Sequence, residues 1–285
     1  MAVALSDSTE VVQRRRSRPL ATVIPLTIVV AIALIAVVGP FFTPDAKVIQ
    51  LRNAKRGLFT PGHLLGTDAF GRDILARVVE GARVSLTVGI ASVGVCILVG
   101  GGIGMIAGYR GGVVDAVLMR LMDIILAFPS LVLALTIAAF LGPSIRNVVL
   151  AVAFSQLPHF ARLSRATTIS IREREFVLGS SLLGARHGHI LRKHIVPNIA
   201  PPLITYGLLA VGIAILVAAS LSFLGLGVRP PTPSWGSMIA EGRPDLDGAP
   251  HIALVPGAML FITILSLNLV ADSVRSKVTS AGGGA

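Results

Sequence analysis

Long apolar stretches, separated by charged connections, run through most of the chain. A membrane-spanning helix needs ~20 apolar residues to cross a hydrocarbon core about 30 Å thick, and six stretches approach or exceed that length. They cover residues 20–42, 84–109, 115–141, 145–163, 199–226 and 252–271. As a helix rising ~1.5 Å per residue, the first would be about 35 Å long. The pattern predicts an all-α, multi-pass membrane protein with six transmembrane helices.

Composition supports a membrane as the solvent. Hydrophobic residues make up 53% of the chain and charged residues 14%, and the mean hydropathy is +0.81. That leaves too little polar surface to coat a soluble particle of this size. The net charge of +11 does not indicate nucleic-acid binding, because no basic-aromatic interleaving or helix-turn-helix pattern accompanies it. The single cysteine, Cys96, lies in an apolar stretch and excludes an intrachain disulfide.

The basic residues also predict an orientation. Four arginines lie between residues 14 and 18, just before the first stretch, and such residues favour the cytosolic side. This stretch is longer than the apolar core of a signal peptide, so an uncleaved span is expected. An even number of spans then places both termini in the cytosol. The predicted parts are a tail over 1–19, an external loop with an amphipathic helix over 43–83, and a tail over 273–285.

The connection over residues 164–198 is long, strongly charged and compatible with helices. Connections of this length tend to be functional. Gly184 is suited to end a first short helix in the left-handed conformation, and Pro197 is expected to stop a second helical stretch over 187–196. Two short helices at a membrane surface form either a docking element for a soluble partner or an interfacial anchor, and the pattern alone favours neither.

The sequence REFVLGSSLLGA over 174–185, followed by HIVPN over 194–198, resembles the EAA loop of ABC importer permeases. In that family the loop is a coupling helix that sits in a groove of a cytosolic ATPase. The resemblance implies that contacts with the ATPase are made by Glu173, Glu175, Phe176, Val177, Leu178, Gly179, Ser180, Leu182, Leu183, Gly184 and Ala185. Leu178, Gly179 and Ser180 stand where the family has Glu-Ala-Ala. A salt bridge from that glutamate is therefore not expected at this position, and Glu175 or Glu173 could replace it only from a different helical face.

Three further segments resemble the dipeptide, oligopeptide and nickel branch of these permeases. HLLGTDAFGRD over 63–73 is similar to the branch signature H-P-L-G-T-D-x-x-G-R-D, and residues 222–236 and 268–275 resemble two other signatures. The first segment supplies candidate residues of an external site: Gly66, Thr67, Asp68, Gly71, Arg72 and Asp73. Local structure is an alternative, with Thr67 and Asp68 as a helix cap and Asp73 paired with Arg77 one helical turn later.

Four residues in the spans are candidates for a gate or for the pathway. Arg120 and Asp123 lie three apart, so they are expected to pair on one helix face, either as a structural pair or as a gate. Pro129 is expected to kink or loosen its helix. His159 is either a helix-contact residue or a proton relay or metal ligand.

Catalytic chemistry is not indicated. The glycines at 179 and 184 have the spacing of a phosphate loop, but Ala185 and Arg186 follow where that loop needs Lys and then Ser or Thr. Metalloprotease and serine hydrolase motifs are absent from the sequence. We therefore expect this chain to bind no metal or cofactor, and the energy for transport to come from a partner.

These resemblances imply a type I ABC importer permease fold, with a core over 84–272, in a bacterial inner membrane. They imply a second homologous permease, two cytosolic subunits that bind ATP and Mg²⁺, and an external solute-binding protein that delivers peptides. An ion-coupled secondary transporter or channel is the alternative. That class needs ionisable residues near the bilayer midplane or internally repeated, broken helices.

Overall fold

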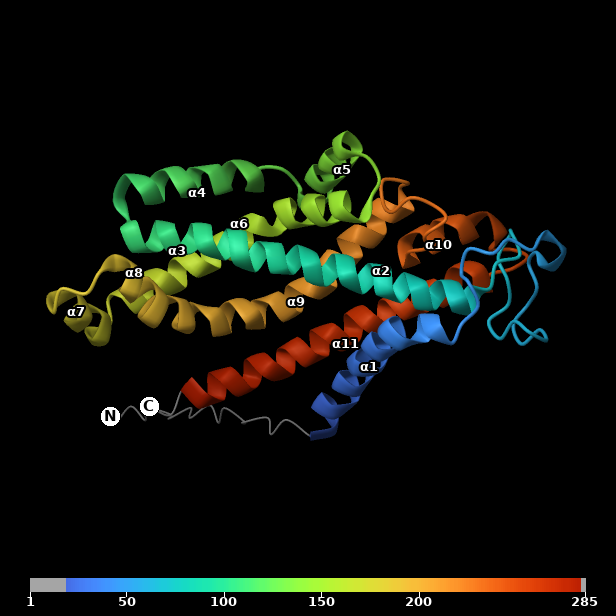
Figure 1. Cartoon of the computed structure of the whole chain (residues 1–285), viewed down its shortest axis with the longest axis horizontal. Coiled ribbons are helices and arrows are strands. Elements are labelled where there is room, and N and C mark those ends of the chain that lie inside the picture. Colours follow the sequence, from blue (N-terminus) through green and yellow to red (C-terminus); the bar gives the residue numbers. More distant parts are fainter. Residues whose placement is uncertain (1–18, 283–285) are drawn as a thin grey trace, which may run out of the picture.

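A computed structural model describes residues 19–282 of the chain, with side chains over 23–276, and this part is helical without a strand. The basic segment at 14–18 and most of the predicted tail at 1–19 lie outside the described residues. Figure 1 shows the helices, which are α1 Pro19–Val38, α2 Ile74–Val95, α3 Gly101–Arg110, α4 Gly112–Leu126, α5 Ser130–Leu141, α6 Ile145–Arg172, α7 Glu175–Leu182, α8 His187–Ile190, α9 Val196–Phe223, α10 Trp235–Gly242 and α11 His251–Gly282.

Five of the six predicted apolar stretches lie largely in one long helical segment each, and the stretch over 115–141 is divided between α4 and α5. By length and apolarity, four helices of the described part can cross a membrane, or five if the bent pair α4 and α5 forms one span. The α2 and α3 helices act as one rod because a π turn, Cys96–Gly100, joins them. The α6 helix is 28 residues long but is not one of these four. Its arginines and other polar side chains lower its hydropathy.

Two expectations about helix ends were wrong. Residues 74–83 form no separate amphipathic helix in the external loop, because they are the first turns of α2. Pro197 does not stop the preceding helix, because α8, a π turn over Leu191–Ile195 and α9 form one continuous rod. Pro197 lies in the first turn of α9, where a missing backbone N–H is tolerated after the wider π turn.

The break at Pro129 was predicted correctly. The α4 helix ends at Leu126, α5 begins at Ser130, and their axes differ by 88°. Pro129 occupies the cap position of α5 with an extended ψ of 126°. Its ring and missing donor prevent α4 from continuing through it.

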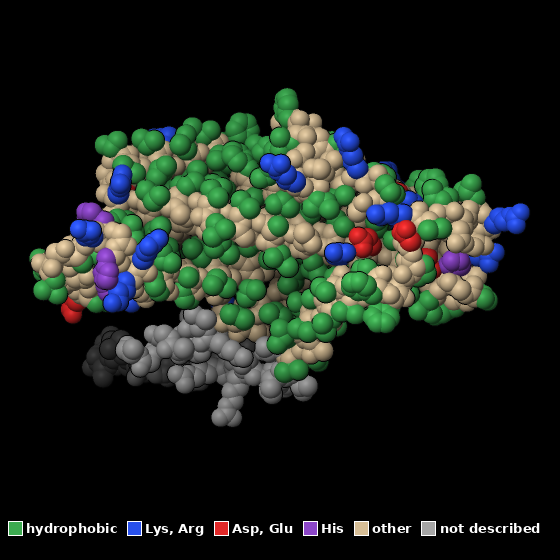
Figure 2. Space-filling model, in the orientation of Figure 1, with side chains coloured by type: hydrophobic (Ala, Val, Ile, Leu, Met, Phe, Trp, Pro, Cys, Tyr) green, Lys and Arg blue, Asp and Glu red, His purple; other side chains and the backbone are tan. Residues whose placement is uncertain are grey.

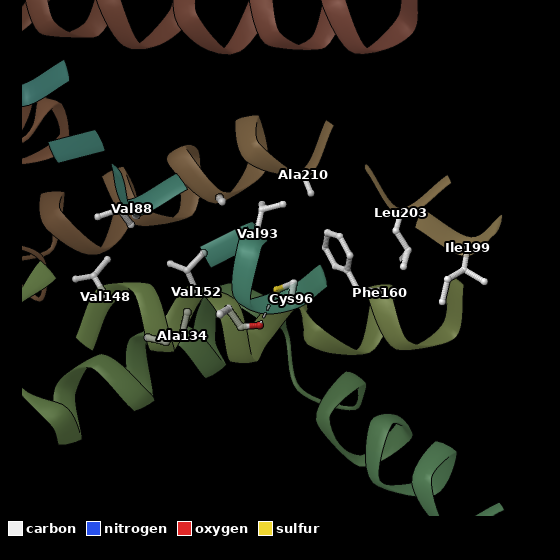
Figure 3. Packing of buried hydrophobic residues seen from close by; sticks show 14 of the residues in the cluster. Val88, Val93, Cys96, Ala134, Val148, Val152, Phe160, Ile199, Leu203 and Ala210 are labelled. Atoms are coloured by element: carbon white, nitrogen blue, oxygen red, sulfur yellow. Dashed lines mark hydrogen bonds between the residues drawn. The ribbon is translucent and has the colours of Figure 1, made fainter. Parts of the chain in front are cut away.

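The tightest packing lies between α3 and α6, where glycines let the two backbones meet. A Cβ atom on Gly104 would lie 2.0 Å from the carbonyl oxygen of Ala161, so only glycine fits there. Beside this contact, the buried side chains of Phe160, Cys96 and Leu203 form part of the main hydrophobic core (Figure 3). Helices α2, α6 and α9 are thereby held as a central layer.

The two ends of the molecule differ in character. Figure 1 places α7 and α8 at one end of the long axis, and the loop over 43–73 with α10 at the other. Apolar side chains cover much of the visible face between them, while Lys, Arg and His gather around α7 and α8 (Figure 2). Acidic side chains lie beside basic ones toward the loop end. The apolar middle fits a membrane, and the two ends carry the candidate sites.

Candidate functional site

The first short helix predicted for the segment over 164–198 is present as α7, and Gly184 defines its end. This glycine has a φ of +79°. The N–H of Ala185 donates to the carbonyl of Ser180, and the N–H of Gly184 donates to that of Ser181. This pair of hydrogen bonds is a Schellman motif, which needs a left-handed residue at the glycine position. The chain therefore turns sharply at the position predicted from the sequence.

One edge of this turn is apolar and open. The side chains of Leu182 and Leu183 are 89% and 90% exposed, and those of Phe176 and Leu178 are about half exposed. Val177 faces the other way and is buried in the main core. Gly179 and Ser180 are partly buried, and Ala185 packs against the core. A short helix is thus fixed on one side and presents leucines on the other.

Three residues outside the predicted sites attach α3 to the segments on either side of α7. Arg172, in the last turn of α6, donates from Nη1 to the carbonyls of Gly108 and Tyr109 at 3.1 Å each. The Tyr109 hydroxyl lies 2.9 Å from Nδ1 of His187. A cation at the C-terminal carbonyls of a helix also interacts favourably with the helix dipole. These contacts surround a hollow of about 630 Å³ behind α7.

The two glutamates of the segment lie where α6 ends and α7 begins. Glu173 is the cap residue at the end of α6, and Glu175 lies in the first turn of α7. Both are exposed, and neither forms an ion pair within the described part of the chain. A carboxylate in the first turn of a helix favours that helix through its dipole. Glu175 therefore favours α7 locally, and the exposed edge of this helix is mainly apolar.

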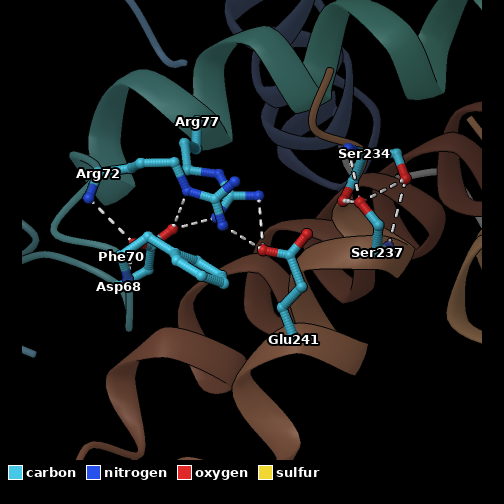
Figure 4. A network of polar contacts seen from close by, with 7 residues as sticks. All are labelled: Asp68, Phe70, Arg72, Arg77, Ser234, Ser237 and Glu241. Carbon is cyan, nitrogen blue, oxygen red and sulfur yellow. Dashed lines mark hydrogen bonds and ion pairs between the residues drawn. The ribbon is translucent and has the colours of Figure 1, made fainter. Parts of the chain in front are cut away.

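At the opposite end, the external signature builds a buried ionic network (Figure 4). Asp68 accepts hydrogen bonds from Nε of Arg72 at 2.6 Å and from Nη1 of Arg77. Glu241 of α10 accepts from Nη2 of Arg72 at 2.5 Å and from Nη2 of Arg77 at 2.9 Å. The Asp68 and Arg77 side chains are each only 2% exposed. Two carboxylates and two guanidiniums thus join the loop, α2 and α10.

The alternative that Thr67 and Asp68 cap a helix was wrong, because a different residue caps α2. Asp73 caps α2 by accepting from the N–H of Ala76 at 2.9 Å, and it also contacts Nδ1 of His63 at 2.8 Å. The predicted ion pair between Asp73 and Arg77 does not form, because Arg77 reaches Asp68 instead. The partner of a long arginine side chain depends on how the loop folds back.

The remaining signature residues shape the loop itself. Gly66 and Gly71 have φ values of +77° and +73°, and a Cβ on either would strike main-chain oxygens, at 2.4 Å and 1.9 Å respectively. The Thr67 hydroxyl accepts from the N–H of Arg56 at 2.9 Å and donates to the carbonyl of Asn53. These contacts fold residues 50–73 onto themselves. All six signature residues therefore lie together in one compact structure.

The four pathway candidates lie on α4, on α6 and at the break between α4 and α5. Arg120 and Asp123 do not pair as predicted, because Asp123 accepts from Nη2 of Arg162 on α6 at 2.6 Å. Arg120 and His159 are exposed, and Pro129 lies at the break between α4 and α5. Neighbouring helices, which sequence spacing does not reveal, decide these contacts. No group of three potential metal ligands occurs among the described residues.

Apolar rods of membrane-spanning length, a short helix with an open apolar edge at one end and a structured loop at the other define a multi-pass membrane protein. The chain belongs to the family described as "Binding-protein-dependent transport system inner membrane component", which it matches over residues 100–279. Two inward-facing crystal forms of the MetNI methionine ABC transporter share its fold. Their TM-scores are 0.58 and 0.57, with 15% and 16% identity over 70% of this chain and 95% of each of those chains.

Curated relatives are more similar in sequence. The dipeptide transport system permease protein DppC of Alkalihalophilus pseudofirmus is 40% identical over 277 residues, which cover 96% of this chain and 90% of that protein. The glutathione transport system permease protein GsiD of Pectobacterium atrosepticum is 41% identical over 76% of this chain and 72% of its own length. The di/tripeptide permease DppC of Pseudomonas aeruginosa is 42% identical over 75% and 71%. The chain is thus an inner-membrane permease of the ABC transporter class.

Proposed function

We propose that this chain is one of two permease subunits of an ATP-driven importer that carries di- or oligopeptides across the inner membrane. The observation that carries the proposal is the open leucine edge of α7, held by Gly184 in a chain of this family. An exposed apolar edge on a rigid short helix suits a groove on a soluble partner. The peptide cargo is supported by the names of the similar permeases.

The proposed assembly contains a second homologous permease, two cytosolic ATP-binding subunits and an external solute-binding protein. The ATP-binding subunits hold ATP and Mg²⁺, and this chain holds no cofactor. The α7 end and both termini face the cytosol in this arrangement. The loop over 43–73, stiffened by its ionic network, faces the binding protein with α10.

Coupling follows from the way α7 is attached. The ATPase contacts Leu182 and Leu183, and Val177 transmits displacement of α7 to the core. Arg172 transmits it to the C-terminal end of α3 through two hydrogen bonds. The ATPase shifts the conformational equilibrium only if it holds α7 differently in the outward and inward states. Because α3 and α6 pack backbone to backbone, they move together.

The proposal is tested by affinity purification of the chain from its own membrane, followed by reconstitution into liposomes. We expect wild type to copurify with ATP-binding subunits and to take up a labelled dipeptide only when ATP is supplied on the α7 side. The double variant Leu182→Asp, Leu183→Asp is expected to keep its fold, because both side chains are exposed, and to lose the ATP-binding subunits.

Phe59→Asp is the matched control, because Phe59 is a 77% exposed apolar residue at the opposite end of the molecule. It is expected to retain the ATP-binding subunits. Uptake by the purified chain alone, driven by a proton gradient without ATP, would contradict the proposal and favour an ion-coupled secondary transporter. If wild type and the leucine variant copurify with equal amounts of the ATP-binding subunits, α7 is not the docking element.

A further inference from the structure

A second hollow, of about 700 Å³, lies between α6 and α9 near their α7 ends. It is separate from the hollow behind α7 and shares no lining residue with it. Its lining includes Thr167, Arg174, Thr205, Leu209 and Arg275. None of the pathway candidates drawn from the sequence is among them.

Polar groups of two kinds line this hollow. The hydroxyls of Thr167 and Thr205 donate to carbonyls of their own helices at 2.9 Å, so their oxygen lone pairs remain available to accept. Arg174 and Arg275 add guanidinium groups, and no acidic side chain is among the described residues that line the hollow. The threonine hydroxyls can accept from the N–H groups of a peptide main chain, and the guanidiniums can donate to its C-terminal carboxylate. The hollow therefore offers partners for both parts of a peptide.

The hollow continues along one open face of α9. Thr205 and Leu209 are followed, at intervals of three or four residues, by Ile213, Leu216 and Ser220, and this spacing defines a single helix face. Ile213 and Leu216 are 51% and 50% exposed, so no other described helix of the chain covers this face. Leu216 and Ser220 line an apolar groove beside α10 at the other end. One face thus connects a hollow at each end of the helix.

We infer that the hollow between α6 and α9 is a cargo-contact site on the translocation path, where the main chain and terminal carboxylate of the peptide bind. The inference rests on the proposed function as a peptide permease. The hydroxyls of Thr167 and Thr205 accept from peptide N–H groups, and Arg174 donates to the carboxylate. The open face of α9 forms this chain's wall of the path from the outer groove to the hollow.

The assembled transporter in liposomes tests the site with a dipeptide and with the same dipeptide carrying a C-terminal amide. In Arg174→Gln, KM for the dipeptide with a free carboxylate is expected to rise by about tenfold, because one charge-assisted hydrogen bond to the carboxylate is lost. KM for the amidated dipeptide is expected to stay the same. A general loss of coupling through the nearby α7 would change both KM values equally. The ratio of the two KM values within one variant therefore reports on the carboxylate contact alone.

Thr205→Val keeps the side-chain shape and removes the oxygen, so KM is expected to rise by about fivefold for both peptides. Thr136→Val is the matched control, because the exposed Thr136 hydroxyl makes the same bond to its own helix, to Val132 at 2.9 Å, outside the hollow. Unchanged KM ratios in Arg174→Gln, or equal effects of the two threonine variants, would overturn the inference. Wild type that transports neither peptide would overturn the proposed function, and this inference with it.

Cysteine labelling gives a second measurement that does not depend on transport. The natural thiol, Cys96, is 1% exposed, so a water-soluble thiol reagent reports on an introduced cysteine. In the assembled transporter, Thr205→Cys is expected to react and to be protected by saturating free peptide. Thr136→Cys is expected to react at a rate that the peptide does not change. Labelling of Thr205→Cys that is insensitive to the peptide would contradict the site.

Discussion

Arg77 of α2 and Glu241 of α10 form an ion pair of 2.9 Å between Nη2 and Oε2. Asp68 of the loop accepts from the same arginine, and Arg72 contacts both carboxylates. Each buried charge therefore has partners of opposite sign from two different segments. Such a network holds its elements in one relative position, and its loss is expected to release the loop over 43–73 from α10.

Asp68→Asn tests this network. The substitution leaves two buried guanidiniums with one carboxylate, and removal of one partner from a buried ion pair typically costs about 3–5 kcal/mol. We expect thermal unfolding in detergent at a clearly lower temperature, followed by the fluorescence of Trp235, the only tryptophan in the chain. Lys55→Gln is the control, because Lys55 pairs with Asp245 while 51% exposed, and such pairs contribute ~1 kcal/mol or less. Equal shifts in both variants would show that the network adds no special stability.

Gly104→Ala tests the contact between α3 and α6. The added Cβ would lie 2.0 Å from the Ala161 carbonyl oxygen, so the helices must separate, and overpacking typically costs about 1–3 kcal/mol. Gly102→Ala is the matched control, because a Cβ atom on Gly102 meets nothing within 4 Å. Alanine also favours the helix over glycine. We expect a lower unfolding temperature for the first variant and an equal or higher one for the second.

Gly184→Ala tests the left-handed turn after α7. A Cβ at this position meets nothing within 4 Å, so the cost comes from φ of +79°, and about 1 kcal/mol is expected. Gly184→Asn should be milder because asparagine tolerates this conformation. We expect ATPase binding to weaken in the order Gly, Asn, Ala, measured by copurification. Equal binding by all three would show that the turn geometry does not set the docking surface.

Arg172→Gln tests transmission from α7 to α3. The variant loses the hydrogen bonds to the carbonyls of Gly108 and Tyr109, each contributing about 1–3 kcal/mol for a charged donor. We expect dipeptide uptake to fall more than ATP hydrolysis, so that more ATP is consumed for each peptide carried. Arg192→Gln, an exposed arginine in the neighbouring π turn, should leave this ratio unchanged. A parallel loss of both activities in Arg172→Gln would indicate failed docking instead.

Features encoded by a residue and its immediate neighbours were predictable. The break at Pro129 and the end of α7 at Gly184 agree with expectation, because a missing donor or a left-handed φ acts locally. Pro197 was misjudged, since the π turn before it lets the helix continue. Local rules thus located the helix ends at Pro129 and Gly184 and failed where an irregular turn compensates for a proline.

Contacts between distant segments were not predictable in the same way. Asp123 pairs with Arg162 instead of Arg120, and Arg77 pairs with Asp68 instead of Asp73. Long arginine side chains reach several carboxylates, and the one that is reached depends on how helices and loops pack. The anchor made by Arg172 and Tyr109 was missed for the same reason, although an arginine in the last turn of α6 was visible in the sequence.

The sequence by itself determined that the chain is a helical membrane protein with a short helix that ends at Gly184, because apolar length and turn chemistry are properties of short segments. It also carried the motifs that identify the permease family. Only the tertiary structure decided which face of α9 stays open and which side chains share the hollow beside it. Helix rotation is set by packing against neighbours, such as the backbone contact between Gly104 and Ala161, and these neighbours come together only when the chain folds.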